Sequence, residues 1–245
     1  MDAVKKNTEL GIYGNAFDQK GFNDFILGHN VVGFFENEIT LKSGRKSHFY
    51  VNWRKPTEDA LLTDILSNYV IRFIKSKGLQ VDTIYGVPEG ATKLAVITQF
   101  KYSKDKNPVV REGDFVLAMG RGKIKDHGSA DDRLFLGKPK GNVLVLEDTT
   151  TTGGSLIDTI TMLQKEGINV VAAVGLTNRN ERRDDGNSVA EALQKLGVKY
   201  YPMSNATELL PEAAKKSNTR LEILDKVEEE FKEYGEKSLK FYARK

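Results

Sequence analysis

The stretch that decides the fold is Val143-Leu-Val-Leu-Glu-Asp-Thr-Thr-Thr-Thr-Gly-Gly-Ser155. Its first four residues, 143–146, are apolar and too few for a helix, so they predict a buried strand. An all-apolar strand is typical of a parallel sheet covered on both faces. A polar loop follows, and from Leu156 apolar residues recur at helical spacing. The stretch therefore predicts a strand, a loop and a helix in succession.

This order predicts an anion site, because backbone N–H groups and the positive end of a helix would surround the loop. Gly153 and Gly154 let the backbone approach a ligand closely, and Thr151, Thr152 and Ser155 can donate hydroxyl hydrogen bonds. The acidic pair at 147 and 148 would repel a phosphate. Carboxylates beside a phosphate site suit a sugar, because they accept hydrogen bonds from vicinal hydroxyls.

The whole stretch resembles the phosphoribosyl diphosphate (PRPP) motif of type I phosphoribosyltransferases. The resemblance implies that Glu147 and Asp148 are catalytic and hold the ribose. It also implies that the loop binds the phosphate of PRPP through Thr149, Thr150, Thr151, Thr152, Gly153, Gly154 and Ser155. The alternative is a strand–helix turn that is rich in threonine by chance.

A second motif is Ile39-Thr-Leu-Lys-Ser-Gly-Arg-Lys-Ser-His-Phe-Tyr-Val-Asn52, which predicts two strands around a turn at Gly44. It is similar to the signature of orotate phosphoribosyltransferases; the alternative is a solvated basic hairpin. The resemblance implies that Lys42 contacts PRPP and orotate, and that Tyr50 and Val51 line the base together with Thr151. Val51 stands where an aromatic residue is usual, so only Tyr50 would stack.

A third motif is the polar segment 120–132, which carries Arg121, Lys123, Lys125 and His127 among three glycines. Such a segment is either a solvated basic loop or a lid that closes over a polyanion. It resembles the catalytic loop of the orotate enzymes, which implies that all four residues bind PRPP and that Lys125 and His127 are catalytic. Gly122 occupies a position that is basic in the family.

Two further positions follow from the same resemblance. Arg179, after the apolar strand predicted at 169–176, would pair with the carboxylate of orotate, with Arg182 and Arg183 as alternatives. The loop at 83–91 would touch the diphosphate, but Glu89 and Gly90 stand where the family often has Tyr and Lys or another polar residue.

The remaining pattern predicts an α/β fold with a mostly parallel twisted sheet flanked by helices, the type I phosphoribosyltransferase fold. Helices are expected at 58–77, 91–100, 155–166, 188–196 and 219–242. Strands are expected at 109–110, 169–176 and 198–202, and the segment 83–91 is expected to be a strand that enters a tight loop. The apolar run 115–119 is expected to be either a core strand or the strand that feeds the following loop. We divide the chain into a small N-terminal hood with the base-binding segment, 1–57, and a PRPP-binding core with a C-terminal helix, 58–245.

Composition narrows the classes of function. The 245 residues carry a net charge of only +3, so no global field indicates a nucleic-acid partner. The absence of cysteine excludes disulfides, thiolate catalysis and cysteine-based zinc sites. No apolar run has the length of a membrane span, and residues 1–6 lack the apolar core of a signal peptide. We therefore expect a cytoplasmic protein without membrane or nucleic-acid partners.

Together, these resemblances imply an enzyme that makes orotidine 5′-monophosphate and diphosphate from orotate and PRPP. Mg²⁺ would arrive on PRPP, without a direct protein ligand. The family also implies a homodimer in which the loop 120–132 is shared across the interface. Two alternatives remain open at this point: a phosphoribosyltransferase for another nucleobase, and a non-catalytic PRPP-sensing regulator on the same fold.

Overall fold

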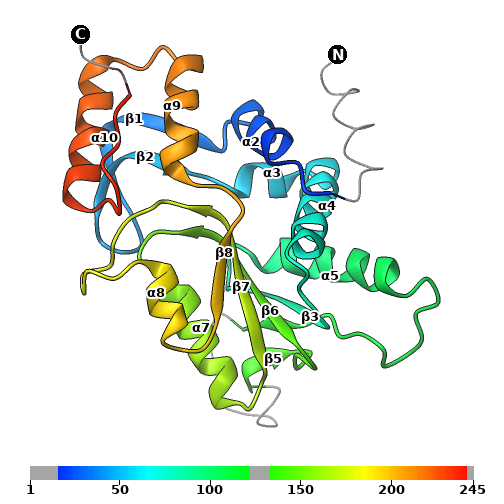
Figure 1. Cartoon of the computed structure of the whole chain (residues 1–245). Helices are drawn as coiled ribbons and strands as arrows, with labels where there is room; N and C mark the ends of the chain where they lie inside the picture. Colours follow the sequence, from blue (N-terminus) through cyan, green and yellow to red (C-terminus); the bar gives the residue numbers. More distant parts are fainter. Residues whose placement is uncertain (1–15, 122–132, 242–245) are drawn as a thin grey trace.

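The computed structural model describes residues 16–121 and 133–241. Its centre is a parallel sheet in the order β3-β6-β7-β8, formed by β3 (Thr83–Gly86), β6 (Val143–Thr150), β7 (Val170–Asn178) and β8 (Lys199–Pro202) (Figure 1). All three strand pairs run parallel. The predicted α/β fold with its parallel sheet is confirmed.

Both faces of the sheet are covered, as the apolar run at 143–146 predicts. Leu144 and Leu146 enter one hydrophobic core with α4 (Ala60–Ser76) and α5 (Thr92–Lys106). Val143 and Val145 enter the opposite core with α7 (Gly154–Lys165) and α8 (Val189–Gln194). All four strand residues are fully buried. Alternate side chains therefore hold the strand between two layers of helix, which fixes the sheet edge where the loop emerges.

The helix ends follow local capping chemistry. Asp59 caps α4 by accepting a hydrogen bond from the Leu62 backbone N–H, and the chain leaves this helix through Gly78 with φ 63°. Ser188 and Glu191 form a reciprocal capping box at the start of α8. These local contacts fix where α4 ends and where α8 begins.

The hood consists of α2 (Gln19–Gly28), the antiparallel pair β1 (Val32–Thr40) and β2 (Lys46–Val51), and α3 (Arg54–Glu58). The helices α9 (Ala206–Lys216) and α10 (Leu221–Glu233) pack against β1 and β2 (Figure 1). Trp53 joins the hood to the sheet, because its Nε1 donates to Thr177 Oγ1 at 3.0 Å and its ring stacks on Phe22. The hood is thereby held over the carboxyl end of β7.

Some predicted elements differ from the structure. Residues 109–110 are not a strand, and 115–119 is not a core strand. Only β4 (Met119–Gly120) pairs there, with β5 (Phe135–Leu136), in a two-stranded sheet apart from the central one. Val109 and Leu117 are exposed, whereas Ala118 is buried in the same core as α7 and Val116 packs against that core. The C-terminal helix ends at Glu233 rather than 242, and α9 lay outside the predicted elements.

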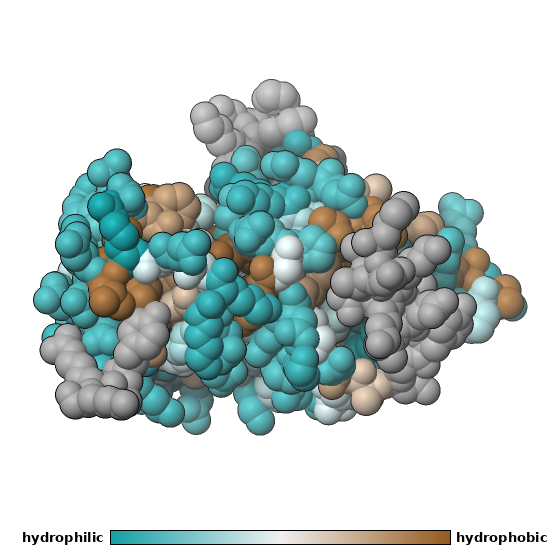
Figure 2. Space-filling view, turned by 90° about the horizontal axis from the view of Figure 1, so that it is seen from above, coloured by the Kyte–Doolittle hydropathy of each residue, from teal (hydrophilic) through white to brown (hydrophobic). Residues whose placement is uncertain are grey.

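The surface in Figure 2 is mainly hydrophilic, with hydrophobic residues in small separate groups. Within the two described ranges, every helix is too short or too polar to cross a membrane.

Candidate active site

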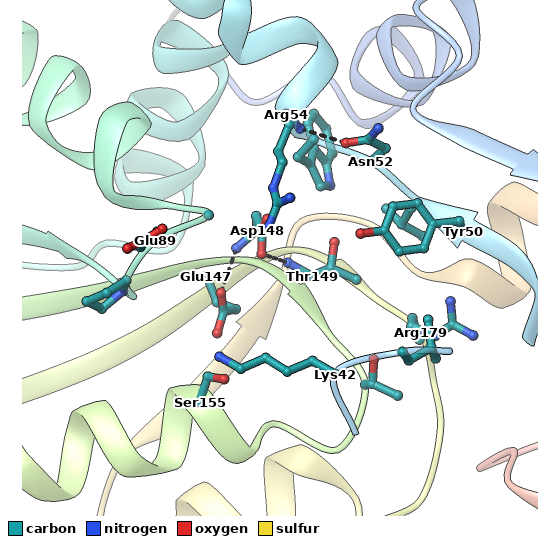
Figure 3. Close-up of a pocket in the computed structure, with 16 residues that line it drawn as sticks. Lys42, Tyr50, Asn52, Arg54, Glu89, Glu147, Asp148, Thr149, Ser155 and Arg179 are labelled. Atoms are coloured by element: carbon teal, nitrogen blue, oxygen red, sulfur yellow. Dashed lines mark hydrogen bonds between the residues drawn. The ribbon is translucent and has the colours of Figure 1, made fainter. Parts of the chain in front are cut away.

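Two adjoining hollows lie where the central strands end, beneath the hood. Figure 3 shows the residues that line the first of them. The first has a volume of about 180 Å³ and the second about 270 Å³. They share five lining residues: Lys42, Glu147, Thr149, Thr151 and Ser155. The hairpin motif and the motif that follows β6 therefore meet in one place, at the strand ends where sites in parallel sheets form.

Glu147 is buried at the floor between the two hollows, with 6% of its surface exposed. Burial raises the pKa of its carboxyl well above the ordinary value, and the neighbouring Asp148 charge raises it further. The charge of Lys42 opposes this rise. In Figure 3 the Lys42 side chain extends from the hairpin toward Glu147 and Ser155. The ammonium group of Lys42 thus faces the carboxyl group of Glu147 across the space that a ligand would occupy.

Asp148 is held by the backbone and by a close glycine. Its Oδ1 accepts a 2.7 Å hydrogen bond from the Thr149 N–H, while its own N–H donates to Glu147 Oε1 at 3.2 Å. Gly90 lies against the carboxylate so closely that a Cβ at position 90 would overlap it. The sequence showed position 90 only as a lost polar side chain; the structure shows that its absence makes room for Asp148. Glu89 lines the same hollow, after a cis Pro88–Glu89 peptide.

The anion loop has the expected form. Gly153 precedes α7 with φ 69°, a left-handed conformation that glycine adopts without strain, and no described side chain caps the helix there. The first N–H groups of α7 are therefore directed at the second hollow, which Thr151, Thr152, Gly153, Gly154 and Ser155 line. Asp158 also lines this hollow, one turn into the helix.

The threonines at 149 and 150 point in different directions, because side chains alternate along β6. Thr149 lines both hollows, and its buried Oγ1 has no hydrogen-bond partner among the described residues. Thr150 lines neither: it is 1% exposed, and its Oγ1 lies 2.6 Å from the hydroxyl of Tyr200. The sequence placed Thr150 among the PRPP ligands, whereas in the structure its hydroxyl stabilises the packing of the sheet.

The other end of the first hollow is formed by the hood. Tyr50 and Val51, which were predicted to line the base, line this hollow together with Leu41, Asn52, Trp53 and Arg54. Figure 3 shows the Arg54 side chain reaching toward Asp148. The residues Asn52 to Arg54 were not predicted to be site residues. Asn52 is the last residue of the hairpin motif and Trp53 and Arg54 directly follow it, and this adjacency was the signal that could have included them.

Arg179 lines the first hollow but is almost completely buried. Its Nε donates to Glu181 Oε1 at 2.7 Å, and its two Nη atoms donate to the Phe49 carbonyl oxygen and to Ser47 Oγ. In Figure 3 its guanidinium is turned away from Glu147 and Asp148, toward the hood. Arg179 therefore lies at the end of the hollow opposite the acidic pair.

The two alternative arginines occupy other places. Arg182 donates to the carbonyl oxygens of Gly235 and Glu236, and Arg183 donates to that of Thr152. Neither of them lines either hollow. Of the three arginines, Arg179 is the one that the fold brings to the first hollow.

The predicted catalytic loop lies mostly outside the described residues, including Lys123, Lys125 and His127. Arg121 is described, and its backbone N–H donates to the Leu134 carbonyl at 3.1 Å. The loop therefore leaves and re-enters the described structure beside the small β4–β5 sheet.

Several known proteins with similar sequences are orotate phosphoribosyltransferases. An orotate phosphoribosyltransferase of Rhodopseudomonas palustris is 32% identical over 185 residues, which cover 72% of this chain and 89% of that protein. Its counterpart from Methanosarcina mazei is 28% identical over 209 residues, covering 84% and 98%. No protein-family model matches the chain.

Solved structures agree on the fold. The crystal structure of the orotate phosphoribosyltransferase of Francisella tularensis superposes with a TM-score of 0.63 at 21% identity, and the match covers 87% of this chain and 98% of that one.

Proposed function

The chain belongs to the orotate phosphoribosyltransferase family, and from that premise we propose that it converts orotate and PRPP to orotidine 5′-monophosphate and diphosphate in de novo pyrimidine (UMP) biosynthesis. One observation carries the proposal. Segments far apart in the sequence supply, to a single hollow, an acidic pair, a lysine, an aromatic face and an arginine: Glu147, Asp148, Lys42, Tyr50 and Arg179.

In the proposed reaction the ring nitrogen of orotate forms a bond to the anomeric carbon of the ribose, and the bond to the diphosphate oxygen breaks. The α7 end of the second hollow would hold the 5′-phosphate through backbone N–H groups and hydroxyls. Asp148 and Glu147 would accept hydrogen bonds from the ribose hydroxyls and stabilise positive charge that develops on the sugar.

The base would lie toward the hood, with Tyr50 on its face and Arg179 at its carboxylate. The three hydrogen bonds of Arg179 use three of the five N–H donors of a guanidinium. Two donors therefore remain for a substrate carboxylate. Orotate enters as an anion, so the reaction needs no strong base in this part of the hollow.

Mg²⁺ carried by PRPP would neutralise part of the charge on the departing diphosphate. Mg²⁺ prefers oxygen ligands, and the carboxylates of Glu89 and Asp148, which line the first hollow, would reach the ion on PRPP through water rather than as direct ligands. Lys42 and the loop residues Arg121, Lys123, Lys125 and His127 would supply further positive charge or a proton. A cytoplasmic location completes the proposal.

The function is tested by following the loss of orotate absorbance with PRPP and Mg²⁺ present. Wild type should consume orotate only when both are added. Asp148→Asn should lower kcat/KM for PRPP sharply while the protein remains folded, because it removes a carboxylate beside the ribose. Wild-type kinetics in this variant would end the assignment of the acidic pair.

We also propose that the protein is a homodimer in which the loop 120–132 of each subunit acts in the site of its partner. Closed two-fold dimers are the commonest oligomers. The test mixes two inactive variants, Lys125→Ala in the loop and Asp148→Asn in the sheet. Mixed dimers would collect both lesions in one site and leave the other intact, so activity should return to about a quarter of wild type after random exchange. If subunits exchange and no activity returns, the loop acts in its own subunit.

A further inference from the structure

Arg179 is fixed from three sides by groups outside the hollow. Its guanidinium stacks on the Phe49 ring, with 3.7 Å from Cζ to the ring centroid, and its Nε pairs with Glu181. Its Nη2 donates to Ser47 Oγ at 2.9 Å. Phe49 and Ser47 are both at most 1% exposed. The orientation of the cation therefore depends on how β2 is held.

The residue that holds Ser47 comes from the C-terminal helix. Glu230 on α10 accepts a 2.7 Å hydrogen bond from Ser47 Oγ, and its other oxygen accepts from the His48 backbone N–H. The next residue, Phe231, stacks on Phe49 with 5.8 Å between ring centroids. Two adjacent residues of α10 thus contact Ser47 and Phe49, two of the groups that orient Arg179.

The contact between Glu230 and Ser47 affects Arg179 because it decides where the hydroxyl hydrogen of Ser47 points. A serine hydroxyl has one hydrogen to donate, and both the Phe49 carbonyl and the Glu230 carboxylate lie within reach. A charged acceptor makes the stronger bond and draws this hydrogen. The oxygen lone pairs then remain available to Arg179 Nη2. Without the carboxylate, Ser47 would no longer be held in the geometry that receives the guanidinium.

The charges of the cluster support this arrangement. Glu181 lies between Arg179 and Arg45, whose Nη1 is 3.0 Å from Glu181 Oε2. Burial raises the pKa of Glu230, whereas the His48 and Ser47 hydrogen bonds and the charge of Arg179 lower it. Glu230 therefore gives the buried Arg179 a second negative neighbour, which matters because an unpaired buried cation is costly.

We propose that Glu230 is a positioning residue for orotate: through Ser47 it fixes Arg179 so that the two remaining N–H donors meet the carboxylate of the base. This inference rests on the proposed function. It assigns to α10, which contributes no residue to either hollow, control over the affinity for one of the two substrates.

The test compares Glu230→Gln with Glu229→Gln, an exposed neighbour on the same helix. Glu230→Gln should raise KM for orotate about tenfold, the effect of weakening a hydrogen bond to a charged group. KM for PRPP should stay within about twofold, because the phosphate loop lies at the other end of the site. Glu229→Gln should match wild type.

Ser47→Ala provides a second route in case Glu230→Gln does not fold. It should show the same loss for orotate alone. The loss in the double variant should be well short of the sum of the two single losses, because both changes act on the contact that holds Arg179. Equal losses for orotate and PRPP, additive effects, or an unchanged KM for orotate would each overturn the proposal.

Arg179→Ala separates this inference from the proposed function. If Arg179→Ala weakens orotate and Glu230→Gln does not, the positioning role is wrong and the function stands. If wild type does not turn over orotate at all, the proposed function itself fails.

Discussion

The contact between Gly90 and Asp148 gives the sharpest quantitative prediction. Gly90→Ala adds one methyl group, whose position would overlap the Asp148 carboxylate. The carboxylate is the end of a short side chain, so it can turn away, but it then loses its 2.7 Å bond to the Thr149 N–H. A hydrogen bond to a charged group contributes about 1.5–3 kcal/mol. The same energy in the transition state corresponds to a fall in kcat/KM of about 10- to 150-fold.

The assay is steady-state kinetics with PRPP varied, together with thermal unfolding of each variant. Gly28→Ala is the matched control, because nothing lies within 4 Å of a Cβ there. Gly90→Ala should also have little further effect in an Asp148→Asn background, since both changes act through one carboxylate. A Gly90→Ala enzyme with wild-type kcat/KM, or a full additional loss in the double variant, would refute the reasoning.

Two further predictions concern Glu147 and the anion loop. Because the folded state raises the pKa of Glu147, the folded protein binds more protons than the unfolded one above the ordinary pKa. Stability should therefore fall as pH rises through the raised pKa. Glu147→Gln should remove this pH-dependent loss of stability, so the variant should unfold at a higher temperature than wild type at pH 8. The difference in unfolding temperature should shrink toward pH 4, and a difference that is the same at both pH values would contradict the raised pKa. Gly153→Ala should lose about 1–2 kcal/mol from its left-handed conformation, plus a steric cost from Val189 Cγ1 at 2.9 Å, and should raise KM for PRPP. Gly167→Ala, with φ 73° and open space around it, isolates the conformational cost in chemical denaturation, and equal losses in the two variants would exclude a role for the Val189 contact.

The elements that the sequence predicted correctly are those whose residue types allow only one local structure. The run at 143–146 has no polar position, so it had to be covered on both faces, and the glycines after it had to form a tight loop before a helix. Of the two alternatives for 115–119, the core strand was wrong: this run lies outside the central sheet and Leu117 is exposed, while β4 (Met119–Gly120) leads into the following loop. An apolar pattern indicates burial but does not show whether the residues join the central sheet.

In the site, the sequence identified residue types but not their surroundings. Arg179 was expected to face a substrate. Its partner Glu181 is two residues away in the sequence, but its partners Ser47 and Phe49 follow from long-range packing that no spacing reveals. Gly90 was seen as a departure, and its reason, the approach of Asp148, exists only in three dimensions. Thr150 was grouped with its neighbours, although strand alternation directs it toward Tyr200.

Transfer of the phosphoribosyl group to orotate is measured most directly by phosphorus NMR of PRPP with Mg²⁺ and one nucleobase at a time. We expect diphosphate and a nucleotide monophosphate to appear in equal amounts with orotate, and not with uracil, adenine or hypoxanthine. Diphosphate release with another base in place of orotate would contradict it. Tight binding of PRPP without turnover of any base would point instead to a PRPP-sensing regulator.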